Sequence, residues 1–338
     1  MSLRRAIARN AVETPRGNGH PLIELMLTRL LEGSRRGARS DGAAIALAIE
    51  GGGTCGVISA GMCLVLEKTG LIETVDAIYG TSSGALNGSF TAAGQAALGA
   101  TNYLDVASPQ FANPLRVFTG RAVIDFDFLF DDLICSRRPY DADGLAAGPD
   151  FRALCVDLTT ATLRVLGDFA DTDELTAAVR ASCSLPLLGD APAEIRGQPM
   201  ADGSLIESIP YRSALQDATH VLVLRSHTVA HRQDPYPRPL IELARRAAHP
   251  AVAPLMRERP DRYNAEAEYL NSTGTGTGTG EESLLQLAPP AGTVRVGNLA
   301  LSGHAIREGL AAGAAVAAAA FGLPPVEVLW QPEVYETS

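Results

Sequence analysis

The sequence predicts an α/β fold whose central strands run parallel. Two strand–turn–helix units follow one another within about 50 residues, as is typical of an α/β domain. The first strand, at residues 44–49, is continuously apolar, which indicates a strand buried on both faces of a parallel sheet. No repeat of solenoid length occurs. We therefore expect one domain over residues 43–322, an Arg-rich N-terminal extension over 1–42 and a short tail over 323–338.

The other elements follow from apolar spacing and from capping residues. Within the extension, residues 21–31 place apolar side chains at helical spacing. Residues 57–68 indicate a helix closed by Gly70, and residues 75–79 indicate a second strand that leads into a helix of small residues. Further along, we expect two strands at 151–156 and 162–166, a capped helix at 171–182, a hairpin at 194–200 and a buried strand at 220–225. A flexible Thr-Gly loop at 271–280, a short strand at 294–296 and a last helix at 305–321 complete the chain.

Composition excludes several classes of protein. There are 28 Lys and Arg against 38 Asp and Glu, and a net charge of −10 argues against nucleic acid as a partner. The five cysteines are widely spaced without a Cys-x-x-Cys pair, which favours a reducing compartment over a disulfide framework or a zinc site. The N-terminus lacks the apolar run of a secretory signal, and residues 309–323 are too short to span a bilayer. We expect a cytoplasmic protein with, at most, transient contact with a membrane surface.

The first chemical motif is Gly80-Thr81-Ser82-Ser83-Gly84, which fits the Gly-x-Ser-x-Gly pattern of a nucleophile elbow. A serine at a sharp turn between strand and helix tolerates only small neighbours, so a glycine two residues before and after allows the turn. The hydroxyl is then exposed at a helix N-terminus, where negative charge is favoured. The position of the motif, between an apolar strand and a helix of small residues, favours a catalytic Ser82 over a chance match.

The second motif is the loop Gly51-Gly52-Gly53 at the end of the first strand. Successive glycines let backbone N–H groups converge on one point, where they hold an anion such as the oxyanion of a tetrahedral intermediate. The loop lacks the Lys-Ser/Thr ending of a phosphate-binding P-loop and does not fit a dinucleotide fingerprint. A glycine-rich loop alone is weak evidence, and tight packing of strand on helix is the alternative. Its pairing with Ser82 favours an oxyanion hole.

The base that would activate Ser82 is less evident. None of the six histidines stands in an obvious loop at a strand end, and His227 and His231, four residues apart, lack an acidic third ligand and are interpreted as solvated surface residues. The acidic cluster at 125–132 does not match a calcium loop. We expect no metal and no cofactor. Asp202-Gly203, which follows the hairpin, is the better candidate, although an isolated Asp-Gly pair usually marks a simple turn.

The order of these parts resembles the patatin-like phospholipase family, which works with a Ser–Asp dyad. The resemblance extends over residues 43–215 and includes Arg180-Ala181-Ser182-Cys183-Ser184-Leu185-Pro186 and Met200-Ala201-Asp202-Gly203-Ser204. It implies a three-layer α/β/α fold with a mainly parallel sheet, and a serine acyl hydrolase that cleaves carboxylic esters of lipids through an acyl-enzyme. It also implies the roles of five residues: Ser82 as nucleophile, Asp202 as base, and the amides of Gly51, Gly52 and Gly53 as oxyanion hole.

Two positions depart from the family pattern. Glu50 stands where the glycine-rich block usually begins with Asp, and Cys55 stands where it carries Arg or Lys. The missing cation removes a positive charge beside the oxyanion site, so we expect neutral esters to be favoured over anionic phospholipids. Two alternatives remain open at this point: an acyltransferase built on the same site, and a non-catalytic lipid-binding module.

Overall fold

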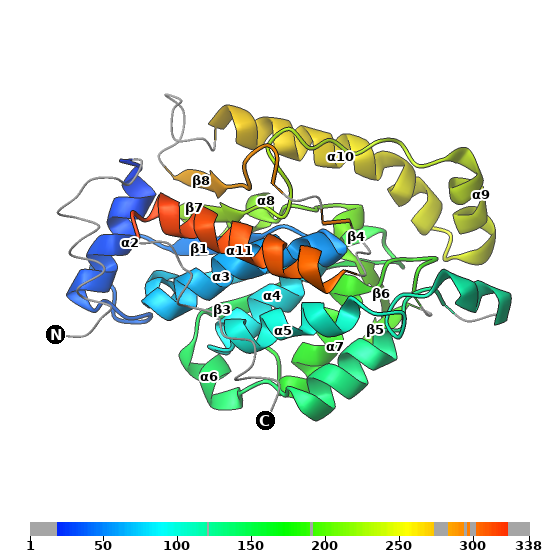
Figure 1. Ribbon diagram of the computed structural model, residues 1–338, viewed down its shortest axis with the longest axis horizontal. Coiled ribbons are helices and arrows are strands. Elements are labelled where there is room, and N and C mark those ends of the chain that lie inside the picture. Colours follow the sequence, from blue (N-terminus) through cyan, green and yellow to red (C-terminus); the bar gives the residue numbers. More distant parts are fainter. Residues whose placement is uncertain are drawn as a thin grey trace.

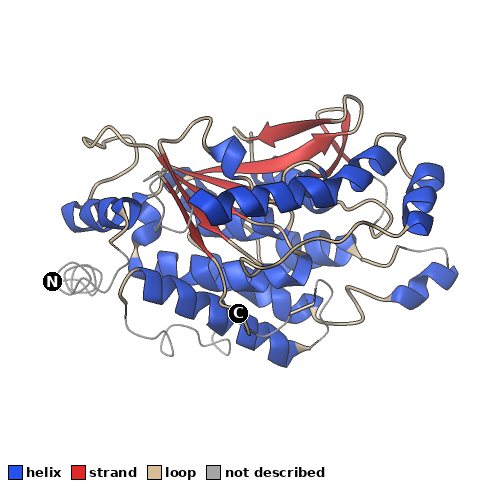
Figure 2. Cartoon of the chain, turned by 90° about the horizontal axis from the view of Figure 1, so that it is seen from above, coloured by secondary structure: helices blue, strands red, loops and turns tan. Residues whose placement is uncertain are grey.

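The computed structural model describes residues 19–119, 122–189, 192–273, 283–293, 296–297 and 302–323. Its centre is an eight-stranded sheet with helices on both faces (Figure 1, Figure 2). The strands are β1 (Ile45–Ile49), β2 (Ala77–Thr81), β3 (Asp150–Asp157), β4 (Thr162–Leu166), β5 (Ala193–Ile195), β6 (Gln198–Asp202), β7 (His220–Leu224) and β8 (Leu284–Leu287).

The sheet is parallel at its centre and antiparallel at one side. The strand order is β5-β6-β3-β2-β1-β7-β8, and β4 pairs with β3 outside this path. Strand β1 pairs in parallel with both β2 and β7, and β2–β3 and β7–β8 are also parallel. The pairs β3–β4, β3–β6 and β5–β6 are antiparallel. The loops after β1, β2 and β7 therefore meet at one edge of the sheet, the edge at which α/β proteins bind ligands.

The described helices form two outer layers. They are α2 (Pro21–Glu32), α3 (Val57–Thr69), α4 (Ser83–Ala92), α5 (Ala96–Val106), α6 (Ala142–Ala147), α7 (Thr172–Cys183), α8 (Tyr211–Ala214), α9 (Arg238–Ala247), α10 (Val252–Thr273) and α11 (Gly303–Ala320). Shorter turns are the 3₁₀ segments η1 (Gly53–Gly56), η2 (Leu71–Thr74), η3 (Pro114–Thr119) and η5 (Gly203–Leu205), and a π-helix, η4, covers Phe128–Arg137.

Successive side chains of β1 point to opposite faces of the sheet, so the strand contributes to a core on each face. Ile45, Leu47 and Ile49 face the larger core, which they share with α2, α3, α4, α5, α7 and α11. Ala46 and Ala48 face the opposite core, which they share with α8 and α10. Figure 1 shows α10 on one side of the sheet and α3, α4 and α5 on the other. The α/β prediction and the expected three-layer arrangement with a mainly parallel sheet are confirmed.

Helix α2 of the N-terminal extension is fixed to the body by one buried cation. Arg29 is 1% exposed and donates to Asp41, to Asp76 and to the backbone carbonyls of Ala43 and Thr74. Asp76 in turn accepts from the amide of Ile45, the first residue of β1. A buried charge of this kind is stable only when it is fully paired. The helix is therefore joined to the base of the central strand.

Helices α3 and α11 pack with their backbones in direct contact. A Cβ atom at Gly61 would lie 2.1 Å from the carbonyl oxygen of Leu310, and one at Gly313 would lie 1.8 Å from that of Ile58. No side chain fits at either position, since real contacts of this kind are longer than 3 Å. Helix α11 thus supports α3, which the short turn η1 joins to the glycine-rich loop.

Most of the expected elements within the described residues occur near the predicted bounds. The hairpin has Gly197 in its turn with φ 75°, and α7 is capped by Asp171, which accepts from the amide of Glu174. Strand β8 was not predicted. Residues 271–273 end α10 instead of starting a loop, and the rest of the Thr-Gly run lies outside the described residues. The first part of the extension, nearly all of the tail and most of the expected strand at 294–296 lie outside them too.

Candidate active site

Ser82 occupies a strained turn between β2 and α4. Its φ is 56° and its ψ is −129°, a backbone conformation that costs a residue with a side chain about 1–3 kcal/mol. Two hydrogen bonds fix the turn to β3. The Ser82 amide donates to Oγ of Ser182 at 3.0 Å, and the Ser182 hydroxyl donates to the carbonyl of Leu154 at 2.7 Å. Strain that is supported in this way is typical of a functional position.

The two motif glycines are required by close backbone packing. A Cβ atom at Gly80 would lie 2.5 Å from Cα of Ala85, and one at Gly84 would lie 2.2 Å from the carbonyl oxygen of Ile49. The first contact lets the chain reverse from strand to helix, and the second brings α4 against the end of β1. The predicted elbow therefore has the steric basis that its sequence pattern suggested.

Strand register brings Asp202 to the same edge of the sheet as Ser82. Thr81 pairs with Leu154, and the next residue of β3, Cys155, pairs with Asp202 at the end of β6. Ser82 and Asp202 therefore stand on opposite sides of β3 at nearly the same level. Two residues that are 120 positions apart in the sequence (202 − 82) become neighbours.

The Asp202 carboxyl is buried, and within the described chain only one of its two oxygens accepts a hydrogen bond. Its exposure is 0%, Oδ1 accepts from the amide of Ser204 at 2.8 Å, and Oδ2 has no hydrogen-bond partner among the described residues. Burial raises the pKa of Asp202, and the Ser204 amide and the neighbouring Ser82 side chain offset part of this rise. A carboxylate with a raised pKa and an unused oxygen beside a serine is suited to accept a proton.

The glycine-rich loop lies against Ser82 and leads into η1. A Cβ atom at Gly51 would lie 3.0 Å from Cβ of Ser82, so the loop and the elbow are in contact. The Gly51 amide is already donated to the carbonyl of Ser208 at 3.2 Å. Gly52 and Gly53 stand at the N-terminal start of η1, where amides have no partner within the helix.

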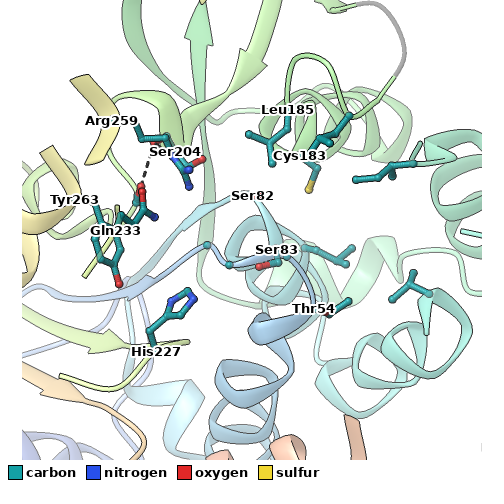
Figure 3. Close-up of a pocket in the computed structure, with 18 of the residues that line it drawn as sticks. Thr54, Ser82, Ser83, Cys183, Leu185, Ser204, His227, Gln233, Arg259 and Tyr263 are labelled. Carbon is teal, nitrogen blue, oxygen red and sulfur yellow. Dashed lines mark hydrogen bonds between the residues drawn. The ribbon is translucent and has the colours of Figure 1, made fainter. Parts of the chain in front are cut away.

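A pocket of about 460 Å³ opens over these residues. It is lined by Ser82 and by all three loop glycines. One part of its wall is apolar and includes Leu86, Val106, Phe111, Ile124, Phe126 and Leu129. The other part is polar and includes His227, His231, Arg232, Gln233, Tyr236 and Arg259. Figure 3 shows His227 and Tyr263 on one side of the site and Cys183 and Leu185 on the other.

The sequence was compared with models of known protein families. The model described as "Patatin-like phospholipase" matches residues 47–215, half of the chain. The chain belongs to the patatin-like phospholipase family. As a member, it is an enzyme, a lipid acyl hydrolase, and its substrates are lipids. A search of curated proteins finds no match.

Solved structures that resemble this patatin-like phospholipase are distant in sequence. The crystal structure of VipD from Legionella pneumophila is 11% identical with a TM-score of 0.43, and the match covers 83% of this chain and 67% of that one. Human GIVD cytosolic phospholipase A2 in complex with methyl gamma-linolenyl fluorophosphonate is 12% identical with a TM-score of 0.29, covering 73% and 48%. In a complex that also contains terbium chloride it is 16% identical with a TM-score of 0.26, covering 49% and 28%.

Sequence reasoning missed a buried ionic cluster beside the loop of this patatin-like enzyme. Glu50 is 0% exposed, and its carboxylate accepts from Arg225 Nε at 2.9 Å, from the Ser226 amide at 2.7 Å and from the Tyr263 hydroxyl at 2.7 Å. His227 Nδ1 lies 2.9 Å from the same carboxylate. The interpretation of His227 as a solvated surface residue is wrong, because its side chain is 13% exposed and lines the pocket.

The cluster gives Glu50, His227 and His231 different protonation states. Burial favours the neutral acid, but Arg225 and His227 outweigh burial and hold the pKa of Glu50 far below its ordinary value. Burial also acts to lower the pKa of His227, but the Glu50 carboxylate and the Cys55 side chain raise it to about 10. Burial and the neighbouring His227 charge lower the pKa of His231 to about 4. At neutral pH, His227 is therefore an imidazolium and His231 is neutral.

Neither a metal-binding cluster nor a membrane-spanning helix occurs in the residue ranges that the structure describes. Within those ranges no group of three or more His, Cys, Asp or Glu side chains could hold a metal ion. Of the helices described, none combines the length and the hydropathy that are needed to cross a bilayer.

Proposed function

We propose that residues 43–322 form the catalytic unit of this lipid acyl hydrolase, and that Ser82 and Asp202 act in it as a dyad that cleaves carboxylic esters through an acyl-enzyme. The observation that carries this proposal is the unpartnered Oδ2 of a fully buried Asp202, next to a serine in a strained elbow. A buried polar atom without a partner is costly, and such an atom is typical of a site that gains its partner from the reaction.

The proposed reaction proceeds in two steps. In the first, Ser82 Oγ forms a bond to the ester carbonyl carbon while Asp202 accepts the hydroxyl proton. The bond to the leaving alcohol then breaks, and Asp202 returns the proton to the departing oxygen. In the second, water attacks the acyl-enzyme, Asp202 accepts a proton from this water, and the proton passes to Ser82 Oγ as the carboxylic acid leaves.

The negative charge of the tetrahedral intermediate needs donors near Ser82. We place them at the amides of Gly52 and Gly53, which line the pocket at the start of η1. Gly51, the third residue that the sequence suggests, supports the loop through its hydrogen bond to Ser208 and separates the donors from the elbow. An amide donor of this kind contributes on the order of 10²–10³ in rate.

Trapping by a fluorophosphonate tests the proposal directly. We expect an alkyl fluorophosphonate to form one covalent adduct, and peptide mass spectrometry to locate it on Ser82. The same sample should release free fatty acid from a glycerol ester of a fatty acid, and transfer of the acyl group to an added alcohol instead would indicate an acyltransferase. An adduct at another serine, with Ser82 unmodified, would contradict the assignment.

Two exposed apolar side chains near the pocket are suited to contact lipid. In η3, Leu115 is 68% exposed and Phe118 is 87% exposed, and the segment joins Phe111 and Ile124 of the apolar wall. Single exposed apolar side chains are common on protein surfaces, whereas several that gather in one place are typical of a surface that binds a protein or a membrane. We propose that this segment makes the transient membrane contact of a peripheral, cytoplasmic enzyme.

The double variant Leu115→Ser/Phe118→Ser measures that contact. Hydrolysis of long-chain ester in vesicles should fall about 3- to 30-fold. Two apolar side chains that become buried in lipid contribute a few kcal/mol to membrane binding, and other contacts with the membrane retain part of this energy. Turnover of a soluble short-chain ester should change less than twofold. A control variant at the exposed Leu243 of α9, Leu243→Ser, should leave both activities near wild type. Equal loss on both substrates would show that the segment supports the fold instead.

A further inference from the structure

We propose that His227 is a fixed positive charge that stabilises the oxyanion formed at the Gly52 and Gly53 amides. The inference rests on the proposed function and adds a residue to its site. It starts from a contact: a Cβ atom at Gly52 would lie 2.8 Å from Cε1 of His227, so the imidazole ring lies directly against the backbone of the loop. The same ring lines the pocket that contains Ser82.

Strand order explains how His227 comes to this place. Strand β7 pairs with β1, and Leu224 stands opposite Ile49 in the register. The residues that follow the two strands therefore emerge side by side, with Glu50 after β1 and residues 225–227 after β7. The Ser226 hydroxyl also donates to the Glu50 backbone carbonyl at 3.0 Å, which fixes the two strand ends together.

Of the three charged residues Glu50, Arg225 and His227, it is His227 that reaches the pocket. Glu50 carries a negative charge, while Arg225 and His227 carry positive charges, so the cluster has one positive charge in excess. Glu50 and Arg225 are both 0% exposed, whereas His227 reaches the pocket. In a site of low dielectric constant, a charge so close to the donors acts strongly on an anion.

The groups around His227 define its protonation. His227 faces the Glu50 carboxylate that follows β1, Cys55 of η1, the His231 ring of its own loop and the Tyr263 ring of α10. Arg225 shares the Glu50 carboxylate with it, and Arg232 acts on His231. The Nδ1–H group is donated to Glu50. The stacked His231 ring, 4.2 Å away between centroids, is neutral at neutral pH and adds no charge to the pair. His227 therefore keeps its proton during the reaction and acts by charge, while Asp202 moves the proton.

A pH profile of His227→Gln tests the role. Glutamine can still donate to Glu50 but has no charge. For the wild type, we expect kcat/KM on a neutral glycerol ester to fall above a midpoint near pH 10, where His227 loses its proton. The variant should lack this alkaline limb and show a kcat/KM about 10- to 100-fold lower at pH 7.5, with most of the loss in kcat.

His231→Gln is the matched control, because it removes the stacked neighbour in the same pocket. It should retain the alkaline limb. Circular dichroism at each pH, on all three proteins, separates loss of charge from unfolding. If His227→Gln keeps the wild-type limb and a kcat within threefold of wild type, the inference is overturned while the proposed function stands.

NMR of the wild-type histidine rings tests the charge without activity. His227 should remain an imidazolium through pH 8, and its assignment follows from the signal that His227→Gln lacks. A titration midpoint below pH 7 would overturn the inference. If instead His227 is charged as expected but the wild type neither cleaves esters nor reacts with the fluorophosphonate, it is the proposed function that fails.

Discussion

Ester hydrolysis by the Ser82→Ala variant is expected to fall on the order of 10⁴–10⁶-fold in kcat, with little change in stability. The variant removes the atom that forms the acyl-enzyme, so the two-step route is closed. The fold should persist because alanine fits wherever serine fits and the supporting hydrogen bond comes from the Ser82 backbone amide. Release of fatty acid, followed by mass spectrometry, and a thermal melt measure the two outcomes.

Ser83 provides the matched control for this variant. It is the next residue, it is 7% exposed like Ser82, and it lines the same pocket. Ser83→Ala should retain activity within about tenfold of wild type and should still react with the fluorophosphonate. Turnover that persists in Ser82→Ala but disappears in Ser83→Ala would move the nucleophile by one residue.

Asp202→Asn is expected to lower kcat on the order of 10²–10⁴-fold. An amide cannot accept the Ser82 proton, but its oxygen can still accept from the Ser204 amide, so the turn at η5 should persist. Asp157→Asn is a suitable control: this side chain is also buried, at 1% exposure, and it accepts from the amides of Thr159 and Thr160, outside the pocket. The control should retain activity within about tenfold.

The acid limb of the pH profile belongs to the same prediction. Protonated Asp202 cannot act as a base, so kcat/KM falls as the pH drops through its pKa. Because burial raises this pKa, the limb should lie above the value of about 4 that is ordinary for Asp. A limb at or below 4, or a variant of a histidine other than His227 that is as inactive as Asp202→Asn, would favour a different base.

The parts of the site that depend on local steric rules could be predicted from the sequence. Gly80 and Gly84 mark the elbow, since no side chain fits at either position. Asp202 was found because a hairpin and Gly203 surround it, and a Cβ atom at Gly203 would lie 2.3 Å from the Leu154 carbonyl oxygen. Whether these residues act as a dyad stays a prediction until the variants are measured.

The parts that depend on strand order could not be predicted. The sequence indicates a buried strand at 220–225, but it does not show that this strand pairs with β1. Without knowledge of that pairing, nothing distinguishes His227 from other loop histidines, and nothing explains why Glu50 replaces the usual Asp of the family. Cys55 was therefore interpreted as the loss of a charge, although the structure brings the charge of His227 to the same loop from another strand. A signal existed: His227 lies only a few residues after a buried strand, at the edge where ligands bind.

The backbone contact between α3 and α11 has a consequence for biosynthesis. Helix α3 follows the glycine-rich loop after the short turn η1, yet the helix that supports it comes far later in the chain, after every strand that the structure describes. A chain that is still on the ribosome has the serine and the loop but lacks this support, because domains fold as units once their parts have emerged. We therefore expect a nascent chain that lacks α11 to be inactive, which would keep an enzyme that digests lipids harmless until this helix has left the ribosome.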